Sequence, residues 1–277
     1  LALWAAAPQS GAALQEDKPM TSHAEKTATF GALHRKGAPV ILYNIWDPGS
    51  AKAVAGAGAA ALATGSAPVA AAHGFADGEK IPFALMLDNL ARIVAASDLP
   101  VTCDLEAGFG ADDAAMSRSV AAVIGVGAVG FNFEDQIIGT TDLRPVGEQA
   151  ARIRAARKAA DGVAKAAFLN ARTDIFLKVP AADHRADMVD AAVERAKAYA
   201  EAGADGFFAP GLADPELIGR LCAAVDLPVN IIALPNVPPA PVLASLGVAR
   251  ISYGPVPYRR MSAWLEGEAK AALSALS

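Results

Sequence analysis

Short apolar segments rich in β-branched residues alternate with longer alanine-rich segments along nearly the whole chain. The short segments predict strands at 39–44, 60–65, 100–106, 128–135, 166–172, 205–210, 228–234 and 249–254. The longer segments repeat apolar residues at three- and four-residue spacing, which is typical of helices, at 85–97, 113–125, 147–161, 186–203 and 215–225. Eight strands, mostly followed by helices, in about 240 residues predict a (β/α)8 TIM barrel, with a doubly wound open sheet as the alternative.

The length of 277 residues fits a single barrel of this kind. No linker-like stretch interrupts residues 38–275, so we predict one domain over 20–277. Residues 1–19 lack an initiator methionine and a basic segment, whereas Met20 and the residues after it look like a natural start. We therefore expect 1–19 to be a disordered N-terminal extension or tag on a cytoplasmic protein, with a signal peptide as the alternative.

Charge and composition exclude several functional classes. The net charge is −5 and the basic residues are scattered, which disfavours binding to nucleic acid or to an anionic membrane. The longest apolar runs are too short to span a bilayer. Cys103 and Cys222 lie among apolar residues and are predicted to be buried and unpaired, and the four histidines lie too far apart to predict a zinc site.

One glycine pattern resembles a dinucleotide-binding motif. The stretch "GVGAVG" at 125–130 satisfies G-x-G-x-x-G. A dinucleotide site needs these glycines after a strand and before a helix, whereas here they follow a predicted helix and precede a predicted strand. The pattern therefore predicts the end of a helix.

Polar side chains gather at the carboxyl ends of the predicted strands, where barrel enzymes build their active sites. They are Tyr43, Asn44, Asp47, Thr64, Ser66, Asp104, Glu106, Glu134, Asp135, Asn170, Arg172, Asp174, Asn230 and Ser252. Alternation along a strand predicts Asp104 and Glu106 on one face, and Glu134 joins them if consecutive strands are neighbours.

Three converging carboxylates would repel one another without a cation. Oxygen ligands without imidazole or thiolate favour Mg²⁺, with Mn²⁺ as a second possibility. Arg172 offers a planar, two-pronged donor for a substrate carboxylate or phosphonate. The alternative is that these residues are helix caps and ion pairs with a purely structural role.

Several motifs carry a resemblance to a known family. They are "YNIWDPGSAK", "ATGSAPVAAAHGFADGE", "DLEAGFG", "FNFEDQ", "NARTD", "GADGFFAPG" and "GVARISYGP". In this order, from about Met20 onward, the chain resembles the isocitrate lyase/phosphoenolpyruvate mutase superfamily. The resemblance implies a barrel whose last helix is swapped onto a neighbouring subunit, in a homo-oligomer that is a dimer or a tetramer. It also implies Mg²⁺ and the cleavage or rearrangement of a C–C or P–C bond beside a 2-oxo acid, through an enolate-like intermediate.

The resemblance also implies roles for individual residues. Asp104 matches the direct metal ligand, and Glu106 and Glu134 match acids that hold the metal through water, although the second acid is more often Asp. Asp77, in "HGFADGE", matches an acid on the loop after the second strand, and Arg172 matches the arginine that anchors the substrate. We thus predict a metal site of Asp104, Glu106 and Glu134 and catalytic roles for Arg172, Asp77 and Glu134. The predicted substrate-binding residues are Gly65, Ser66 and Ala67, whose turn would hold a carboxylate, with Tyr43, Asn230 and Arg172.

The chain departs from the family at the residues that define the reaction. Isocitrate and methylisocitrate lyases carry a K-[KR]-C-G-H loop after the "ED" motif, whereas "EDQIIGTTDLRPVGEQ" at 134–149 has no cysteine. It also lacks the lysine and the Asn-Ser pair of phosphoenolpyruvate mutase, and Pro210 stands where the family often has His or Glu.

Three hypotheses for the function follow. The first is an Mg²⁺-dependent lyase that cleaves a C–C bond in a small 2-oxo or 2-hydroxy (di)carboxylate. The second is a P–C bond mutase or hydrolase acting on a phosphonate, as phosphoenolpyruvate or carboxyphosphonate mutases do. The third, from another class, is a barrel that binds a 2-oxo acid and a metal without turnover.

Overall fold

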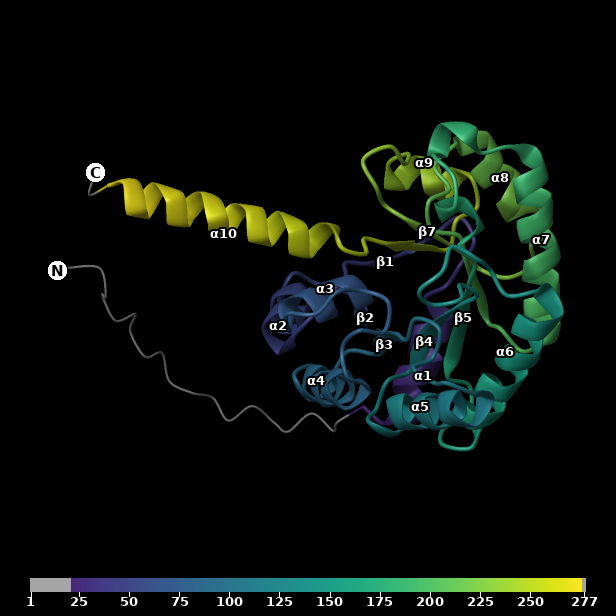
Figure 1. Ribbon diagram of the computed structural model, residues 1–277, viewed down its shortest axis with the longest axis horizontal. Helices are drawn as coiled ribbons and strands as arrows, with labels where there is room; N and C mark the ends of the chain where they lie inside the picture. Colours follow the sequence, from purple (N-terminus) through teal and green to yellow (C-terminus); the bar gives the residue numbers. More distant parts are fainter. Residues whose placement is uncertain (1–20, 276–277) are drawn as a thin grey trace.

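The chain forms eight parallel strands surrounded by helices in a computed structural model that describes residues 21–275 (Figure 1). The strands are β1 Val40–Leu42, β2 Leu62–Ala63, β3 Val101–Asp104, β4 Gly130–Glu134, β5 Phe168–Arg172, β6 Gly206–Phe208, β7 Val229–Ile232 and β8 Arg250–Ser252. All eight predicted strands are confirmed, each shorter than predicted. Residues 1–19, expected to be an extension or tag, lie outside the described part.

The sheet closes on itself. Each strand pairs with its neighbour in the order β1-β8-β7-β6-β5-β4-β3-β2. The two end strands, β1 and β2, meet through a bridge between Ile45 and Thr64, where Ile45 N donates to Ala63 O at 2.9 Å and Gly65 N donates to Ile45 O at 3.3 Å. The predicted (β/α)8 TIM barrel is therefore confirmed, and the open sheet is excluded because its edge strands would remain unjoined.

Helices flank the strands, and most of them pack around the barrel. They are α1 His23–Ala32, α2 Pro48–Gly56, α3 Ser66–Ala72, α4 Phe83–Ala95, α5 Asp113–Gly125, α6 Val146–Asp161, α7 Ala186–Glu201, α8 Pro215–Ala224, α9 Ala240–Ser245 and α10 Val256–Ser274, with short 3₁₀ turns at Ile175–Leu177 and Ala181–Asp183.

The ends of α5 show how local sequence sets helix boundaries. The Asp112 carboxylate accepts from Ala115 N at 2.7 Å and caps the first turn. The helix ends at Gly125, and Gly127 then adopts φ 102°, a left-handed conformation in which a side chain would be strained. The "GVGAVG" pattern is thus a helix end, as predicted.

The amino-terminal end of the barrel is filled by apolar side chains. Phe30 of α1 packs with Val40, Leu42 and Phe168, and its ring meets that of Phe168 edge-on at a centroid distance of 5.6 Å. Helix α1 therefore closes this end. Because this end is plugged, ligands can reach the barrel only from the carboxyl ends of the strands.

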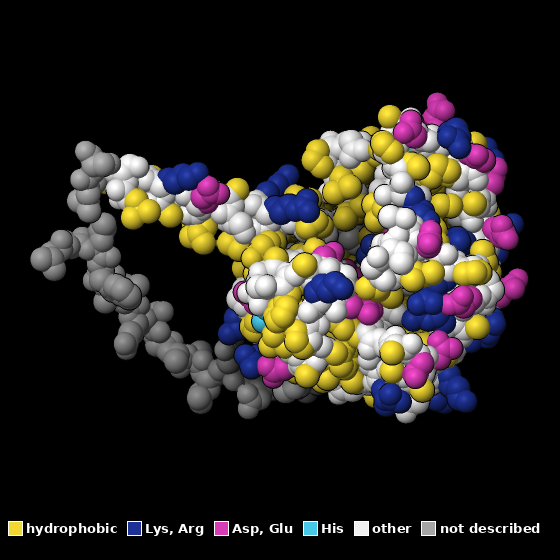
Figure 2. All heavy atoms as spheres, viewed as in Figure 1, with side chains coloured by type: hydrophobic (Ala, Val, Ile, Leu, Met, Phe, Trp, Pro, Cys, Tyr) yellow, Lys and Arg dark blue, Asp and Glu magenta, His cyan; other side chains and the backbone are white. Residues whose placement is uncertain are grey.

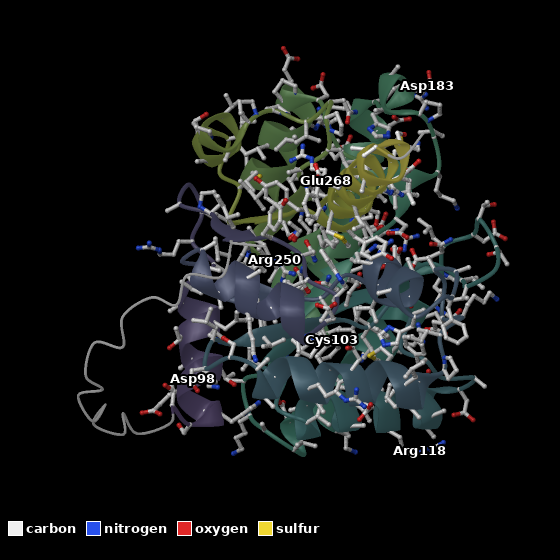
Figure 3. The ribbon with its side chains drawn as sticks, turned by 90° about the vertical axis from the view of Figure 1, so that its left-hand side faces the viewer. Asp98, Cys103, Arg118, Asp183, Arg250 and Glu268 are labelled. Atoms are coloured by element: carbon white, nitrogen blue, oxygen red, sulfur yellow. The ribbon has the colours of Figure 1, made fainter. Side chains whose placement is uncertain are left out.

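A polar layer lies above this plug, inside the barrel. Arg250 is 1% exposed and lies in the centre of the molecule (Figure 3). Its Nη2 donates to Asn132 Oδ1 at 3.2 Å, and the same oxygen accepts from Asn170 Nδ2 at 2.9 Å. Hydrogen bonding of this kind offsets the cost of burying polar groups. The layer forms the floor beneath the carboxyl-end site.

The last helix, α10, extends away from the barrel instead of covering it (Figure 1). Only Pro257 of this helix is buried, and Trp264, Leu265 and Leu273 are exposed. Figure 2 shows apolar side chains along α10 and on the adjoining face of the body. No helix within residues 21–275 combines the length and apolarity needed to cross a membrane. At its start the helix touches the barrel, where the ring of Tyr258 meets that of Trp46 edge-on at a centroid distance of 5.1 Å. The swap of this helix onto a neighbouring subunit stays a prediction.

Candidate active site

A cavity of about 310 Å³ opens at the carboxyl ends of the strands. One side is polar and comes from the turn before α3, the loop after it, and the ends of β3, β4 and β5. The opposite wall is apolar and is formed by Leu177, Phe208, Pro210, Ile232 and Leu234. The cavity thus combines a charged side with a wall that bears no ionisable group.

Asp104 is held at the end of β3 by its neighbours. Its Oδ2 accepts from Ser66 N at 3.1 Å, its backbone N donates to Thr64 Oγ1 at 3.0 Å, and Asn132 Nδ2 lies 3.4 Å from its Oδ1. Gly65, Ser66, Ala67 and Asp104 all line the cavity, so the predicted carboxylate-binding turn and the predicted metal ligand lie together.

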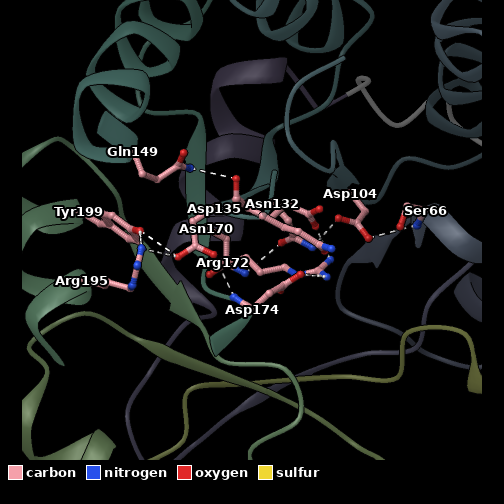
Figure 4. Close-up of polar contacts among 12 residues, drawn as sticks. Ser66, Asp104, Asn132, Asp135, Gln149, Asn170, Arg172, Asp174, Arg195 and Tyr199 are labelled. Carbon is pink, nitrogen blue, oxygen red and sulfur yellow. Dashed lines mark hydrogen bonds and ion pairs between the residues drawn. The ribbon is translucent and has the colours of Figure 1, made fainter. Parts of the chain in front are cut away.

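Arg172 lies between two buried carboxylates (Figure 4). Its Nε and Nη2 donate to the two oxygens of Asp174 at 2.5 and 2.8 Å, and its Nη1 lies 2.7 Å from Glu134 Oε2. Burial raises the pKa of Glu134, and the positive charge of Arg172 opposes this shift. Glu134 is therefore engaged with Arg172 and is not among the residues that line the cavity.

A network from α7 fixes this arrangement. Asp135 is fully buried, and its Oδ1 accepts from Asp174 N at 3.0 Å. Its Oδ2 accepts from Arg195 Nη1 and from Tyr199 Oη, both at 3.0 Å (Figure 4). Asp135 thus positions Asp174, which in turn holds Arg172. The sequence placed Asp135 at a strand end but gave no signal for the partners from α7.

Glu106 lies just beyond β3 in an unusual backbone conformation. Its φ is 50°, so the alternation that predicted one face for Asp104 and Glu106 has already ended. Its Oε2 accepts from Glu79 N at 2.8 Å, and Glu106 and Asp104 line a small adjacent pocket. Burial, and then the charges of Asp77 and Asp104, raise the pKa of Glu106 to about 8. Asp77 lines the main cavity, and burial followed by Asp104 raises its pKa.

The donor set fits a hard cation held mainly through water. Within residues 21–275, no three carboxylate, imidazole or thiolate groups converge tightly enough to form a closed cage around an ion. Mg²⁺ commonly keeps several waters and binds protein through one or two carboxylates. Asp104 could supply one such carboxylate. Asp77 and Glu106 lie close enough for the charge of Asp104 to raise their pKa, so they could hold waters of the same ion. The roles of Asp104, Glu106 and Glu134 at a metal stay predictions.

Two predicted substrate-binding residues lie outside the cavity lining. Tyr43 is on the outer side of the barrel, where its ring packs against Tyr253 at a centroid distance of 4.9 Å. Asn230 is buried in the polar layer and bonds to Ser252 Oγ. Asn44 lines the cavity instead, and its Oδ1 accepts from the backbone N of Tyr253 and of Gly254, both at 2.8 Å. Tyr43 and Asn44 both follow the end of β1 and border a groove on the outside of the barrel, but only Asn44 also lines the cavity.

The buried acids predict a stability that depends on pH and on metal. Without a divalent cation, the free energy of unfolding should fall by about 2–4 kcal/mol between pH 4.5 and 8, because the folded protein keeps the Glu106 proton that the unfolded chain releases. Urea unfolding at both pH values, with EDTA or Mg²⁺, measures this. Mg²⁺ should stabilise more at pH 8, and Glu106→Gln should flatten the metal-free profile. A Gln variant with the wild-type profile would contradict the assignment.

Comparisons with known proteins agree with the geometry. The family model of phosphoenolpyruvate phosphomutase matches residues 30–273. A solved structure from Burkholderia cenocepacia J2315, described as a candidate phosphonomutase, is 50% identical with a TM-score of 0.88, over 91% of this chain and 100% of that chain. An uncharacterized protein of Mycobacterium tuberculosis is 34% identical over 232 residues, 83% of either chain. An oxaloacetate decarboxylase of Pseudomonas fluorescens is 28% identical over 249 residues, 85% of this chain and 81% of that protein.

These matches confirm the superfamily predicted from the motifs, and they cover the strands and loops that build the cavity. The chain therefore belongs to the phosphoenolpyruvate phosphomutase family within the isocitrate lyase superfamily, and it is an enzyme of the carbon–carbon lyase or phosphonomutase type.

Proposed function

We propose that the protein is an Mg²⁺-dependent lyase that cleaves a C–C bond in a small 2-oxo or 2-hydroxy (di)carboxylate through an enolate-like intermediate. The observation that carries this proposal is the pairing of a carboxylate-rich side, with Asp77 and Asp104, and a wholly apolar opposite wall. The charged side is where negative charge on the substrate's 2-oxygen would be compensated. The apolar wall suits carbon substituents and uncharged leaving fragments.

The same wall argues against phosphoryl chemistry. Enzymes that move a phosphoryl group surround its oxygens with cations and N–H donors. Arg172 is balanced by Glu134 and Asp174, Arg259 is the other cation among the lining residues, and these residues include no lysine or histidine. None of residues 137–146, which follow the "ED" motif, is among the lining residues either. Phosphoryl chemistry would need cationic groups that this cavity lacks, whereas C–C cleavage would not. The lining therefore favours C–C cleavage.

The side chains can be assigned roles in the proposed reaction. Bound Mg²⁺ would act as a Lewis acid toward the 2-oxygen of the substrate. Arg172 has five N–H donors; Asp174 engages two and Glu134 a third, so two would be left to donate to a substrate carboxylate. The Gly65–Ala67 turn lies at the start of α3. Gly65 N donates to Ile45 O and Ser66 N donates to Asp104 Oδ2, so the Ala67 N–H is the backbone donor of this turn that would meet a substrate carboxylate. Asp135 keeps Arg172 in place through Asp174.

One observation favours a second candidate function. The solved structure that is 50% identical to this chain is described as a candidate phosphonomutase. P–C chemistry on a phosphonate substrate thus remains the alternative proposal. A barrel that binds a 2-oxo acid and metal without turnover is the third, since the loop at 137–146 supplies no acid or base to the cavity.

A substrate panel tests these proposals. Purified protein with Mg²⁺ is incubated with oxaloacetate, 2-methylisocitrate, 2,3-dimethylmalate or phosphonopyruvate, and the release of a 2-oxo acid product is followed with a coupled assay. We expect turnover of at least one C–C substrate, abolished by EDTA and restored by Mg²⁺. Turnover of phosphonopyruvate alone would replace the proposal with P–C chemistry.

The proposal includes a homo-oligomer in a cytoplasmic setting. The exposed apolar side chains of α10, and Ile41 and Tyr43 on the outer face beside β1, would cover each other between copies of the chain. Burial of such apolar surface is the main drive for association. Light scattering should give the mass of a dimer or a tetramer, and a stable monomer would contradict this part.

A further inference from the structure

A buried cation without an ion-pair partner lies inside the barrel, beneath the cavity. The Arg250 side chain comes from β8, is 1% exposed and lies in the centre of the molecule (Figure 3). Among residues 21–275, no carboxylate lies within ion-pair distance of its guanidinium. Burying a charge without an adjacent opposite charge costs stability. An ion pair therefore does not account for this arginine.

The hydrogen bonds of Arg250 do not account for it either. Its Nη2 donates to Asn132 Oδ1 at 3.2 Å, but that oxygen also accepts from Asn170 Nδ2 at 2.9 Å. Its Nε lies 3.4 Å from Ser252 Oγ, which also accepts from Asn230 Nδ2 at 3.0 Å. A buried acceptor is costly when it is left without any partner. Since both acceptors have a second donor, Arg250→Met would leave neither of them unpaired.

The charge of Arg250 acts toward the cavity. Burial lowers the pKa of Arg250 to about 9, and the negative charge of Asp104 opposes this shift. The guanidinium therefore stays charged at neutral pH. On the amino-terminal side, burial and then the charge of Arg250 lower the pKa of His34 to about 3, so this ring is neutral. The cavity side is thus where Arg250 faces negative charge.

Asn132 lies between Arg250 and the cavity. It lines the cavity, its Oδ1 accepts from Arg250, and its Nδ2 lies 3.4 Å from Asp104 Oδ1. The amide dipole is therefore aligned from the cation to the carboxylate, and hydrogen bonds in such a chain polarise one another. In a protein interior of low dielectric, a fixed charge acts over several ångströms and needs no reorganisation when negative charge develops nearby.

We propose that the buried charge of Arg250 stabilises the anion that binds in the cavity, and that the fold keeps this arginine at a cost in stability. The inference rests on the proposed function, because the anion is its enolate-like intermediate. Arg250 is not among the residues that line the cavity, so it is a positioning residue that acts through Asn132. Binding groups that cost stability are a common feature of functional sites.

Binding and unfolding measurements with matched variants test the proposal. Oxalate is a planar dianion that resembles the enolate of a 2-oxo acid. Its dissociation constant at saturating Mg²⁺, and that of Mg²⁺ alone, are measured by calorimetry for the wild type, Arg250→Met, Arg250→Lys and the control Arg157→Met. The urea midpoint of each protein is measured without ligands. Arg157 pairs with Asp161 and Asp205 away from the cavity.

The expected effects of Arg250→Met on binding and on stability have opposite signs. Oxalate should bind about 10-fold more weakly, because the anion loses a favourable charge. Mg²⁺ alone should bind at least as tightly, since a cation no longer meets the charge of Arg250. The urea midpoint should equal or exceed that of the wild type, because a buried charge is removed and no acceptor is left unpaired. Arg250→Lys keeps the charge and should stay within about 3-fold of the wild-type oxalate affinity. Arg157→Met should lower the midpoint and leave oxalate binding unchanged.

The outcomes separate this inference from the proposed function. Unchanged oxalate affinity in Arg250→Met overturns the inference and leaves the proposed function standing. A variant that unfolds or has a lower urea midpoint also overturns it, because Arg250 would then have a structural role. Arg250→Lys that binds oxalate as weakly as Arg250→Met contradicts a role for the charge. A wild-type protein that binds no oxalate with Mg²⁺ overturns the proposed function and this inference with it.

Discussion

Replacement of Asp104 by asparagine is expected to abolish the Mg²⁺-dependent exchange of deuterium into the methyl group of pyruvate. This exchange reports formation of an enolate without requiring knowledge of the full substrate. Asparagine keeps an oxygen for the Ser66 N–H but removes the charge that would hold the cation. A lost Lewis acid removes several kcal/mol of charge stabilisation, so the rate should fall by at least about 1,000-fold. Proton NMR in D₂O measures the exchange.

Asp112→Asn is the matched control for this experiment. Asp112 caps α5 on the loop that follows β3, and asparagine caps helices nearly as well as aspartate. Its exchange rate should equal that of the wild type. Unchanged exchange in Asp104→Asn would show that the enolate chemistry does not depend on this carboxylate. No exchange in the wild type, together with tight Mg²⁺-dependent oxalate binding, would favour the non-catalytic barrel.

Replacement of Arg172 by methionine is expected to reduce both stability and turnover. The change leaves Glu134 and Asp174 buried without their cation, and breaking a buried pair in this way costs about 3–5 kcal/mol. It also removes the donor expected to hold a substrate carboxylate, so kcat/KM should fall by at least about 100-fold. Urea unfolding and steady-state kinetics on the best panel substrate measure the two effects.

Arg157→Met is the control that separates the loss of stability from the loss of turnover. The Arg157 side chain is 16% exposed, close to the 15% of Arg172, and it also pairs with two carboxylates, Asp161 and Asp205. It lies away from the cavity and donates to the carbonyl groups of Gly203 and Ala167, before β6 and β5. Its loss should lower stability but leave kcat/KM of the folded protein unchanged. Equal losses of activity in both variants would contradict a substrate role for Arg172.

Much of the fold followed from local sequence patterns. Strand segments, helical periodicity and glycine stops each depend on a few neighbouring residues, so they could be predicted without tertiary information. Because barrel strands succeed one another in order, the convergence of Ser66, Asp104 and Arg172 was also predictable. The alternation rule failed at Glu106, where β3 had ended and the backbone turned to φ 50°.

The partners of the site residues were not predictable, because they come from distant elements. Asp135 accepts hydrogen bonds from Arg195 and Tyr199 of α7, and these contacts depend on how that helix packs against β4 and β5. Asn44 reaches the cavity just after β1 ends, where the backbone N–H groups of Tyr253 and Gly254, some 210 residues later in the chain, donate to its side chain. The sequence contains no pattern that predicts Asn44, and not Tyr43, to line the cavity.

The sequence by itself determined the barrel, the order of its strands and the acids and arginine at their carboxyl ends, because these depend on local pattern and chain order. Only the tertiary structure decided how those charges are balanced. It paired Arg172 with Glu134 and Asp174, and it brought Arg259 from the start of α10 to the opening of the cavity. Charge balance depends on distances of a few ångströms between segments far apart in the chain, and only packing fixes such distances.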